Sequence, residues 1–264
     1  RFRGSAPLSL RRLHRRSEWV GWWQIAICFL IASYYAVVIA WAAAYAWFSI
    51  GTRWGEDPES FFFEDYLAVT DAGTVGGFRT GVLIPLLVIW GVTLVVLNGG
   101  IRKGVERANR IMIPLLVVLF TVIVVRAVTL EGASVGLQAL FEPAWSRIGD
   151  ASIWVAAYGQ IFFSLSIGFA IMITYSSFLP RRGDLTGNAF IAGFSNASFE
   201  LLAGIGVFAA IGFLVVSTGV AVDEVARDGI GLAFVIFPEI ISQLPGPSGL
   251  FGVLFFVSLV LAGV

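Results

Sequence analysis

The stretch that decides the fold is Gly159-Gln160-Ile161-Phe162-Phe163-Ser164-Leu165-Ser166-Ile167-Gly168-Phe169, which lies inside an uncharged run at 151–180. A bilayer core about 30 Å thick needs roughly 20 apolar residues in a helix, so this run is long enough to cross it. Small hydroxyl side chains and a glycine interrupt the branched apolar residues in its middle. One interpretation is close packing against a neighbouring helix. The other is a break in the helix, where freed backbone groups bind an ion or a zwitterion.

The rest of the composition agrees with a membrane location. Of the 264 residues, 58% are hydrophobic and 13% are charged, with a mean hydropathy of +0.89. Soluble domains have about 25% charged residues, so they are excluded. Seventeen basic residues balance seventeen acidic ones, which leaves no basic surplus for nucleic acid. The lone cysteine, Cys28, has no partner for an internal disulfide, and the single histidine, His14, excludes a multi-histidine metal site.

Further apolar windows predict about six membrane spans in all, and each must be helical because lipid leaves free backbone groups without partners. The predicted fold class is therefore an all-α, multi-span membrane protein. The first residue is Arg and the last residues stop inside an apolar stretch, from which we expect a piece of a longer protein. The spans are predicted at 19–50, 81–99, 111–130, 151–179 with a break near 164–168, 188–217 and, truncated, 247–264.

The loops between these spans differ sharply in charge. Segments 1–18, 102–110 and 181–184 carry twelve Lys and Arg and three acids, whereas 53–79, 126–150 and 223–239 carry five basic residues and thirteen acids. The positive-inside rule therefore places the first set in the cytoplasm. The predicted cytoplasmic loops are 1–18, 100–110 and 180–187, and the extracellular segments are 51–80, 131–150 and 218–246.

Two features of the outer side stand out. The apolar run 229–244 contains Pro238 and is expected to form a re-entrant or capping helical hairpin. Trp47 and Trp54 are expected to anchor the outer membrane interface, as tryptophan does in many spans.

Glu200 is the only ionisable residue deep inside a predicted span. An unpaired charge there costs several kcal/mol, so this carboxyl group is a candidate functional residue. Asn196 lies four residues earlier and shares its helix face, and its amide oxygen is a ligand of the kind that Na⁺ accepts. An interhelical hydrogen bond is the simpler interpretation of Asn196. Tyr34 and Tyr35 lie in the middle of a span, where a buried phenol needs an acceptor such as a substrate carboxylate.

These residues resemble those of a known family. Residues 159–169, followed by Ile173-Thr174-Tyr175, resemble the sixth helix of the neurotransmitter:sodium symporters, in particular the bacterial LeuT-like amino-acid transporters. Four other motifs resemble those of the family and occur in the family's order along the chain. They are Ser33-Tyr34-Tyr35 in the third helix, 100–107 before the fifth, 196–200 in the seventh, and 229–234 with 237–239 in the fourth outer loop. The resemblance implies a partial LeuT-type inverted-repeat fold that runs from helix three into helix eight, without helices one and two, so that the chain would not transport alone.

The resemblance also implies a substrate site. The Tyr35 hydroxyl would bind the substrate carboxylate, backbone carbonyls of the broken helix would face its amino group, and Phe163 would form the outer lid. Apolar or small walls favour a hydrophobic amino acid because a charged one would lose its hydration. The implied carbonyl donors are Phe163, Ser164 and Ser166, and the implied side-chain walls are Ile31, Val38, Phe163, Ser166 and Phe169.

Two Na⁺ sites are implied in the same way, both incomplete in this chain. Ser164 and Asn196 match ligands of the first site, and the backbone oxygen of Ala262 matches one of the second. Glu200 stands where chloride-dependent animal members have a serine, which implies chloride independence. Tyr175 matches an inner-gate tyrosine, whereas Phe178 replaces a second one.

The implied activity is sodium-coupled import of an amino acid by alternating access, in a multi-pass protein of the bacterial inner membrane. The implied partners are the amino acid, Na⁺ and the lipid bilayer. An enzyme is not expected, since the chain has no histidine inside a span and one buried acid. Two alternatives stay open: a channel, and a non-transporting receptor-like or scaffold member of the same fold.

Overall fold

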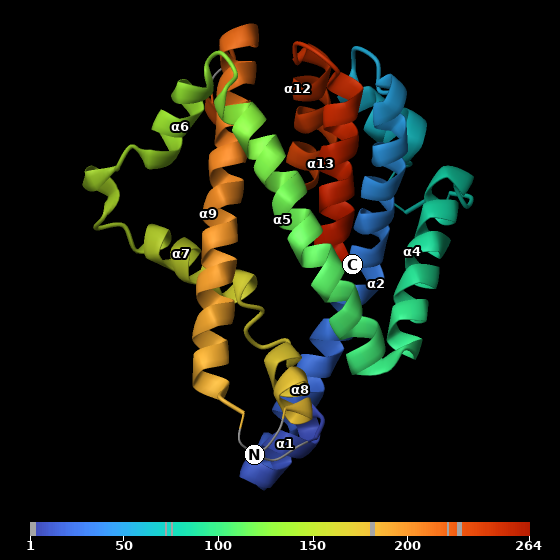
Figure 1. Cartoon of the computed structure of the whole chain (residues 1–264), viewed down its shortest axis with the longest axis vertical. Coiled ribbons are helices and arrows are strands. Elements are labelled where there is room, and N and C mark those ends of the chain that lie inside the picture. Colours follow the sequence, from blue (N-terminus) through green and yellow to red (C-terminus); the bar gives the residue numbers. More distant parts are fainter. Residues whose placement is uncertain (1–3, 72, 75, 180–182, 221, 226–228) are drawn as a thin grey trace. The chain divides into compact units, whose positions relative to one another are not determined.

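The computed structural model describes residues 4–71, 73–74, 76–179, 183–220, 222–225 and 229–264. Within these ranges the regular structure is helical (Figure 1), which confirms the predicted fold class. Parts of the predicted loops, at 180–182 and 226–228, lie outside the described residues. Among the described residues, four helical stretches are long and apolar enough to cross a membrane: Arg15–Gly51, Thr80–Asn98, Lys103–Val128 and Leu185–Thr218.

The main helices fall on the predicted apolar windows. Their bounds are α2 Glu18–Phe48, α4 Thr80–Asn98, α5 Glu106–Val128, α7 Ala151–Ser164, α8 Ile171–Phe178, α9 Leu185–Thr218 and α13 Ser248–Gly263. Shorter helices are α1 Ala6–Leu13, α3 Pro58–Ser60, α6 Ala133–Phe141, α10 Val222–Val225, α11 Gly229–Gly231 and α12 Phe237–Gln243, and short 3₁₀ or π-helical turns (η1–η6) join several of them. Four of the segments predicted as loops thus contain helices of their own: 1–18, 51–80, 131–150 and 218–246.

The run at 229–243 also differs from the expected hairpin. It forms one continuous helical stretch, in which α11 passes through the π-helical turn Leu232–Ile236 into α12. Pro238 does not interrupt it, because this residue lies in the first turn of α12, where a helix needs no backbone donor. The segment predicted to cap the outer side therefore forms a single apolar helix, Gly229–Gln243.

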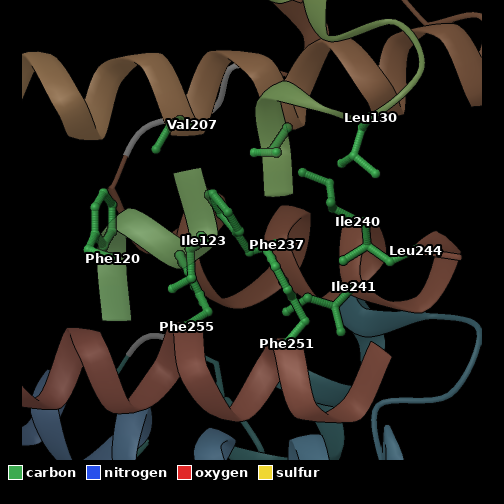
Figure 2. A pocket seen from close by; sticks show the side chains of 13 residues that line it. Phe120, Ile123, Leu130, Val207, Phe237, Ile240, Ile241, Leu244, Phe251 and Phe255 are labelled. Atoms are coloured by element: carbon green, nitrogen blue, oxygen red, sulfur yellow. The ribbon is translucent and has the colours of Figure 1, made fainter. Parts of the chain in front are cut away.

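The chain divides into two compact units, one formed by 1–34 and 143–201 and the other by 35–142 and 202–264. In the larger unit α5, α12 and α13 lie side by side (Figure 1). Figure 2 shows their apolar side chains converging, with Phe237 and Phe255 stacked at 4.0 Å between ring centroids. The void between them has a volume of only about 10 Å³ and entirely apolar walls, so it is a packing defect and not a ligand site.

An aromatic cluster forms the other half of this core. Tyr45 of α2 is fully buried and contacts the rings of Phe62, Phe234 and Phe256, which come from three further segments. Trp54 stacks on Tyr45 at 5.9 Å and is only 2% exposed, so the prediction of an interface anchor at Trp54 was wrong. The indole is buried inside the protein because its ring fills this core and its N–H donates to a side chain there. Trp47, by contrast, is 60% exposed.

Three side-chain hydrogen bonds hold the end of α12 to three different elements. The Trp54 Nε1–H donates to Ser242 Oγ at 2.8 Å, and the Ser217 hydroxyl at the end of α9 donates to Gln243 Oε1 at 2.6 Å. The Arg126 guanidinium, in the last turn of α5, donates to the carbonyl of Pro245 at 2.9 Å. We call Ser242, Gln243 and Pro245 the α12 anchor.

The helix α6 approaches α9 so closely that a side chain would not fit between them. A Cβ atom built on Gly136 would overlap the carbonyl oxygen of Phe208, which belongs to the α9 backbone and cannot move aside as a side-chain end could. Gly212 faces the same contact from α9. Glycine at 136 is therefore required by the approach of two backbones.

We expect Gly136→Ala to lower the stability of the protein by about 1–3 kcal/mol, because the added methyl group forces two helices apart. The check is the thermal unfolding midpoint in detergent. Gly91→Ala in α4 is the matched control, since a Cβ there meets nothing within 4 Å and alanine is the better helix former. Equal midpoints for the two variants would contradict the close approach.

Candidate functional site

The interruption in the fourth predicted span lies between α7, which ends at Ser164, and α8, which begins at Ile171. Ser166 and Ala170 adopt positive φ angles of 50° and 59°, and Gly168 has a φ of 88°. Positive φ is costly for residues that carry a Cβ and ends an α-helix. The small residues that suggested a break thus do occupy one, and the carbonyl end of α7 is opened.

Two of the predicted site residues meet at this opening. The Asn196 side-chain amide on α9 donates a hydrogen bond to the hydroxyl oxygen of Ser164. Both residues lie in the smaller unit, although 32 positions separate them in the sequence. This contact is an interhelical hydrogen bond, as one interpretation of Asn196 predicts, and it also brings two oxygen-bearing side chains together.

A pocket of about 330 Å³ opens beside this contact, with apolar walls that include Ile161, Leu165 and Phe194. Ser164, Asn196 and Glu200 supply its polar lining. The hydroxyl, amide and carboxylate oxygens of these three side chains are hard ligands, which suit Na⁺ better than a transition metal. The carbonyl end of α7 adds the negative end of a helix dipole. The chemistry of this lining therefore fits a small hard cation.

The broken segment is fixed by a residue that the sequence analysis did not assign to the site. The Cys28 thiol, on α2, donates a hydrogen bond to the backbone carbonyl of Phe169 at 2.7 Å. Within the segment itself, the amide of Ser166 donates to the Phe163 carbonyl at 3.0 Å, and that of Phe169 to the Ser166 carbonyl at 3.3 Å. No sequence signal marks Cys28, because its acceptor is a main-chain atom 141 residues away.

The other predicted substrate residues lie along α2. Ile31, Tyr35 and Val38 follow each other at intervals of four and three residues, so they share one face of the helix. In the larger unit, Tyr35 Oη lies near the end of α13, where a Cβ on Gly263 would come within 3.6 Å of it. Ala262, the predicted second-site residue, is the neighbour of Gly263 in that last turn. The structure thus places Tyr35 beside the segment that contains Ala262.

The predicted gate residues are exposed. Phe163 is 74% exposed, and Tyr175 and Phe178 on α8 are 47% and 61% exposed. The smaller unit thus contains Phe163, Ser164, Asn196 and Glu200, whereas Tyr35 and Ala262 belong to the larger one.

Comparison with known proteins identifies the class of this fold and site. Residues 55–264 match the sodium:neurotransmitter symporter family. The chain belongs to that family, whose members are transporters and not enzymes.

Individual relatives agree with the family. An uncharacterized sodium-dependent transporter of Methanocaldococcus jannaschii is 42% identical over 98% of this chain and 53% of its own length. One of Bacillus subtilis is 34% identical over 94% of this chain and 51% of its own. A sodium- and chloride-dependent glycine transporter of Xenopus laevis is 34% identical over 69% of this chain. The chain spans about half the length of the first two relatives.

A solved structure shows the same fold. The crystal structure of MhsT in complex with L-phenylalanine superimposes with a TM-score of 0.79 and 30% sequence identity, over 99% of this chain and 56% of that one. This likeness confirms the LeuT-type arrangement that the sequence motifs implied. The chain is thus part of a multi-pass membrane transporter fold.

We expect Cys28→Val to weaken the hold on the broken segment, because valine has a similar volume but no donor for the Phe169 carbonyl. A neutral hydrogen bond contributes about 0.5–1.5 kcal/mol, so the free energy of unfolding, measured in detergent, should fall by about that amount. Cys28→Ser keeps a donor and should restore most of the loss. If serine behaves like valine, packing and not hydrogen bonding explains the role of Cys28.

Proposed function

We propose that this chain forms the part of a sodium-coupled symporter that binds a hydrophobic amino acid together with Na⁺ and imports it by alternating access. The observation that carries the proposal is the contact between Ser164 and Asn196 at the opened end of α7. It joins the two side chains that the family resemblance matches to one sodium site. Because the chain spans about half the length of its relatives, we expect transport to need residues beyond these 264.

In this proposal Ser164 and Asn196 turn their oxygen atoms to the ion, which requires the Asn196 amide to release its present hydrogen bond and present Oδ1 instead. The Tyr35 hydroxyl donates a hydrogen bond to the substrate carboxylate. The apolar faces of Ile31, Val38 and Phe169, with Phe163 as the outer lid, surround the substrate side chain and favour an apolar one.

The relatives support this substrate class without identifying it. The structural relative MhsT is described in complex with L-phenylalanine, an apolar amino acid. The glycine transporter of Xenopus laevis acts on another amino acid without a charged side chain. Carried to this chain, both favour a neutral amino acid over a charged one.

Alternating access links the ion to the substrate. Na⁺ supplies a positive charge next to the site of the substrate carboxylate, and the side chains of Ser164 and Asn196 hold it there. A bound pair favours the closed state only as far as it binds that state more tightly than the open one. The membrane potential adds about 2.3 kcal/mol per charge per 100 mV to inward movement.

Glu200 gives the proposed transporter its independence from chloride. The carboxylate lies one turn after Asn196 and lines the same pocket, so it supplies a fixed negative charge near the cation. A second Na⁺ site at the end of α13 would use the backbone oxygen of Ala262. The proposed setting is the bacterial inner membrane.

The first test measures binding of radiolabelled phenylalanine, leucine, glycine and glutamate to the protein, expressed with any adjoining sequence, in Na⁺ and in K⁺ buffers. We expect Na⁺-dependent binding of the apolar amino acids. Tyr35→Phe and Asn196→Ala should each weaken it about tenfold or more, because each removes a hydrogen bond or a ligand to a charged group.

Two matched variants serve as controls for this test. Tyr34→Phe changes the neighbouring tyrosine, which lies on another face of α2, and Asn98→Ala changes an exposed amide in α4 that bonds only its own helix. Both should bind like the unchanged protein. Binding that ignores Na⁺ and both site variants would refute the symporter mechanism, and Na⁺-dependent binding without saturable uptake would favour the receptor-like alternative. A flux far above carrier turnover would favour a channel.

The second test concerns chloride. Uptake by the unchanged protein should be the same in sodium chloride and in sodium gluconate. Glu200→Ser removes the fixed charge, and we expect its uptake to fall at least about tenfold in gluconate and to recover in chloride. Glu131→Ser, which changes an acid outside this pocket, is the control. Chloride-dependent uptake by the unchanged protein would contradict the role of Glu200.

A further inference from the structure

A second pocket lies in the larger unit, away from the broken helix. Its volume is about 210 Å³, and it lies between the last turns of α5, the segment at 244–248 and the first turns of α13. Arg126 is its one charged residue, and Val122, Phe251 and Leu254 are among its apolar walls. None of the residues proposed for substrate, Na⁺ or gating lines it.

Arg126 has unused capacity to bind an anion. Its guanidinium group has five N–H donors, and the hydrogen bond to the Pro245 carbonyl uses one of them. Among the described residues, ion pairs join Arg11 to Glu18, Arg110 to Glu106 and Arg147 to Asp150, and none involves Arg126. The pocket thus has a fixed positive charge that no carboxylate neutralises in the described part of the chain.

The order of polar and apolar groups along the pocket follows the order within a lipid. Arg126 lies in the last turn of a membrane-crossing helix, where the guanidinium reaches the level of the phospholipid head groups. Val122 lies one turn deeper, by about 6 Å, and Leu254 lies about 9 Å below the start of α13 at Ser248. The charged end of the pocket therefore lies nearer to the head groups. Its apolar walls, including Val122 and Leu254, extend toward the bilayer interior, and we call them the trough.

We propose that this pocket binds one anionic phospholipid of the outer leaflet, with its phosphate on Arg126 and the upper part of an acyl chain against Val122 and Leu254. Charge and shape each support this occupant. A soluble anion would gain nothing from the apolar walls, and an uncharged apolar molecule would gain nothing from the guanidinium. A bidentate hydrogen bond from arginine to phosphate is among the strongest that a protein makes.

The proposed lipid touches the α12 anchor. The hydrogen bond from Arg126 to Pro245 and the bond between Gln243 and Ser217 hold the same end of α12. A phosphate on the remaining donors fixes the guanidinium in place. The bound lipid thus stabilises the α12 anchor, which holds the end of the proposed capping helix.

The test is native mass spectrometry of the purified protein with dioleoyl-phosphatidylglycerol, compared with dioleoyl-phosphatidylcholine, which has the same chains and no net charge. We expect one phosphatidylglycerol to bind more tightly than phosphatidylcholine. Arg126→Gln should weaken its binding roughly tenfold, as loss of a hydrogen bond to a charged group does. Arg79→Gln, at the outer end of α4 and outside the pocket, should leave it unchanged.

A second variant tests the trough separately from the charge. Val122 is 50% exposed, so Val122→Trp fills the pocket without disturbing the core and should also abolish the tight phosphatidylglycerol binding. Thermal unfolding shows whether each variant is folded. Equal losses in Arg126→Gln and Arg79→Gln, or no loss in Val122→Trp, would overturn the proposal. Displacement of the lipid by equimolar glycerol phosphate would show a site for soluble anions and would overturn it as well.

Discussion

A bilayer offers no hydrogen-bond partner to the backbone, and the rest of this structure depends on that constraint. Every long apolar window becomes a helix because only a helix satisfies its own amide and carbonyl groups. The same constraint gives the gap between Ser164 and Ile171 its meaning. Backbone groups freed there have to find side chains, ions or ligands. The Cys28 thiol donates a hydrogen bond to one of these freed groups, the Phe169 carbonyl. The pocket beside Asn196 and Glu200 offers a place where others can bind an ion or a ligand.

The two compact units differ in how tightly their side chains are packed. The core of the larger one is packed around aromatic rings from α2, two π-helical turns and α13, and the void between α5, α12 and α13 is only about 10 Å³. The smaller one contains the broken helix and many exposed apolar side chains, such as Phe163. A tightly packed body is resistant to deformation, whereas a region with few buried contacts changes conformation at a lower cost in free energy. Ser164 and Asn196, the proposed ligands of the first Na⁺ site, lie in the smaller unit, where a change of conformation costs less.

Much of this fold could be predicted from the sequence, because the positions of membrane helices depend on local properties. Apolar windows predicted the long helices, and the cluster of small residues at 164–168 predicted the break. The features that the sequence analysis missed or predicted wrongly depend on tertiary contacts. Trp54 resembles an interface residue until its stacking on Tyr45 is known, and the acceptor of Cys28 is a backbone atom. The helix α6 was missed because its nine residues are shorter than a span and sit between polar turns. The match of Ser164 to Asn196 came from the family resemblance, since spacing alone could not bring α7 and α9 together.

The α12 anchor has a mechanical consequence. Its contacts with Trp54, Ser217 and Arg126 are crowded into the last turn of α12 and the residue pair that follows. The middle of the same helical stretch is held as well, because Phe234 is buried against Tyr45 in the aromatic cluster. At the other end Gly229 has a φ of 49°, a backbone conformation that glycine adopts freely. A small rotation of the end of α9 would thus be transmitted to the capping helix and to the aromatic core together, since the two are joined at Phe234.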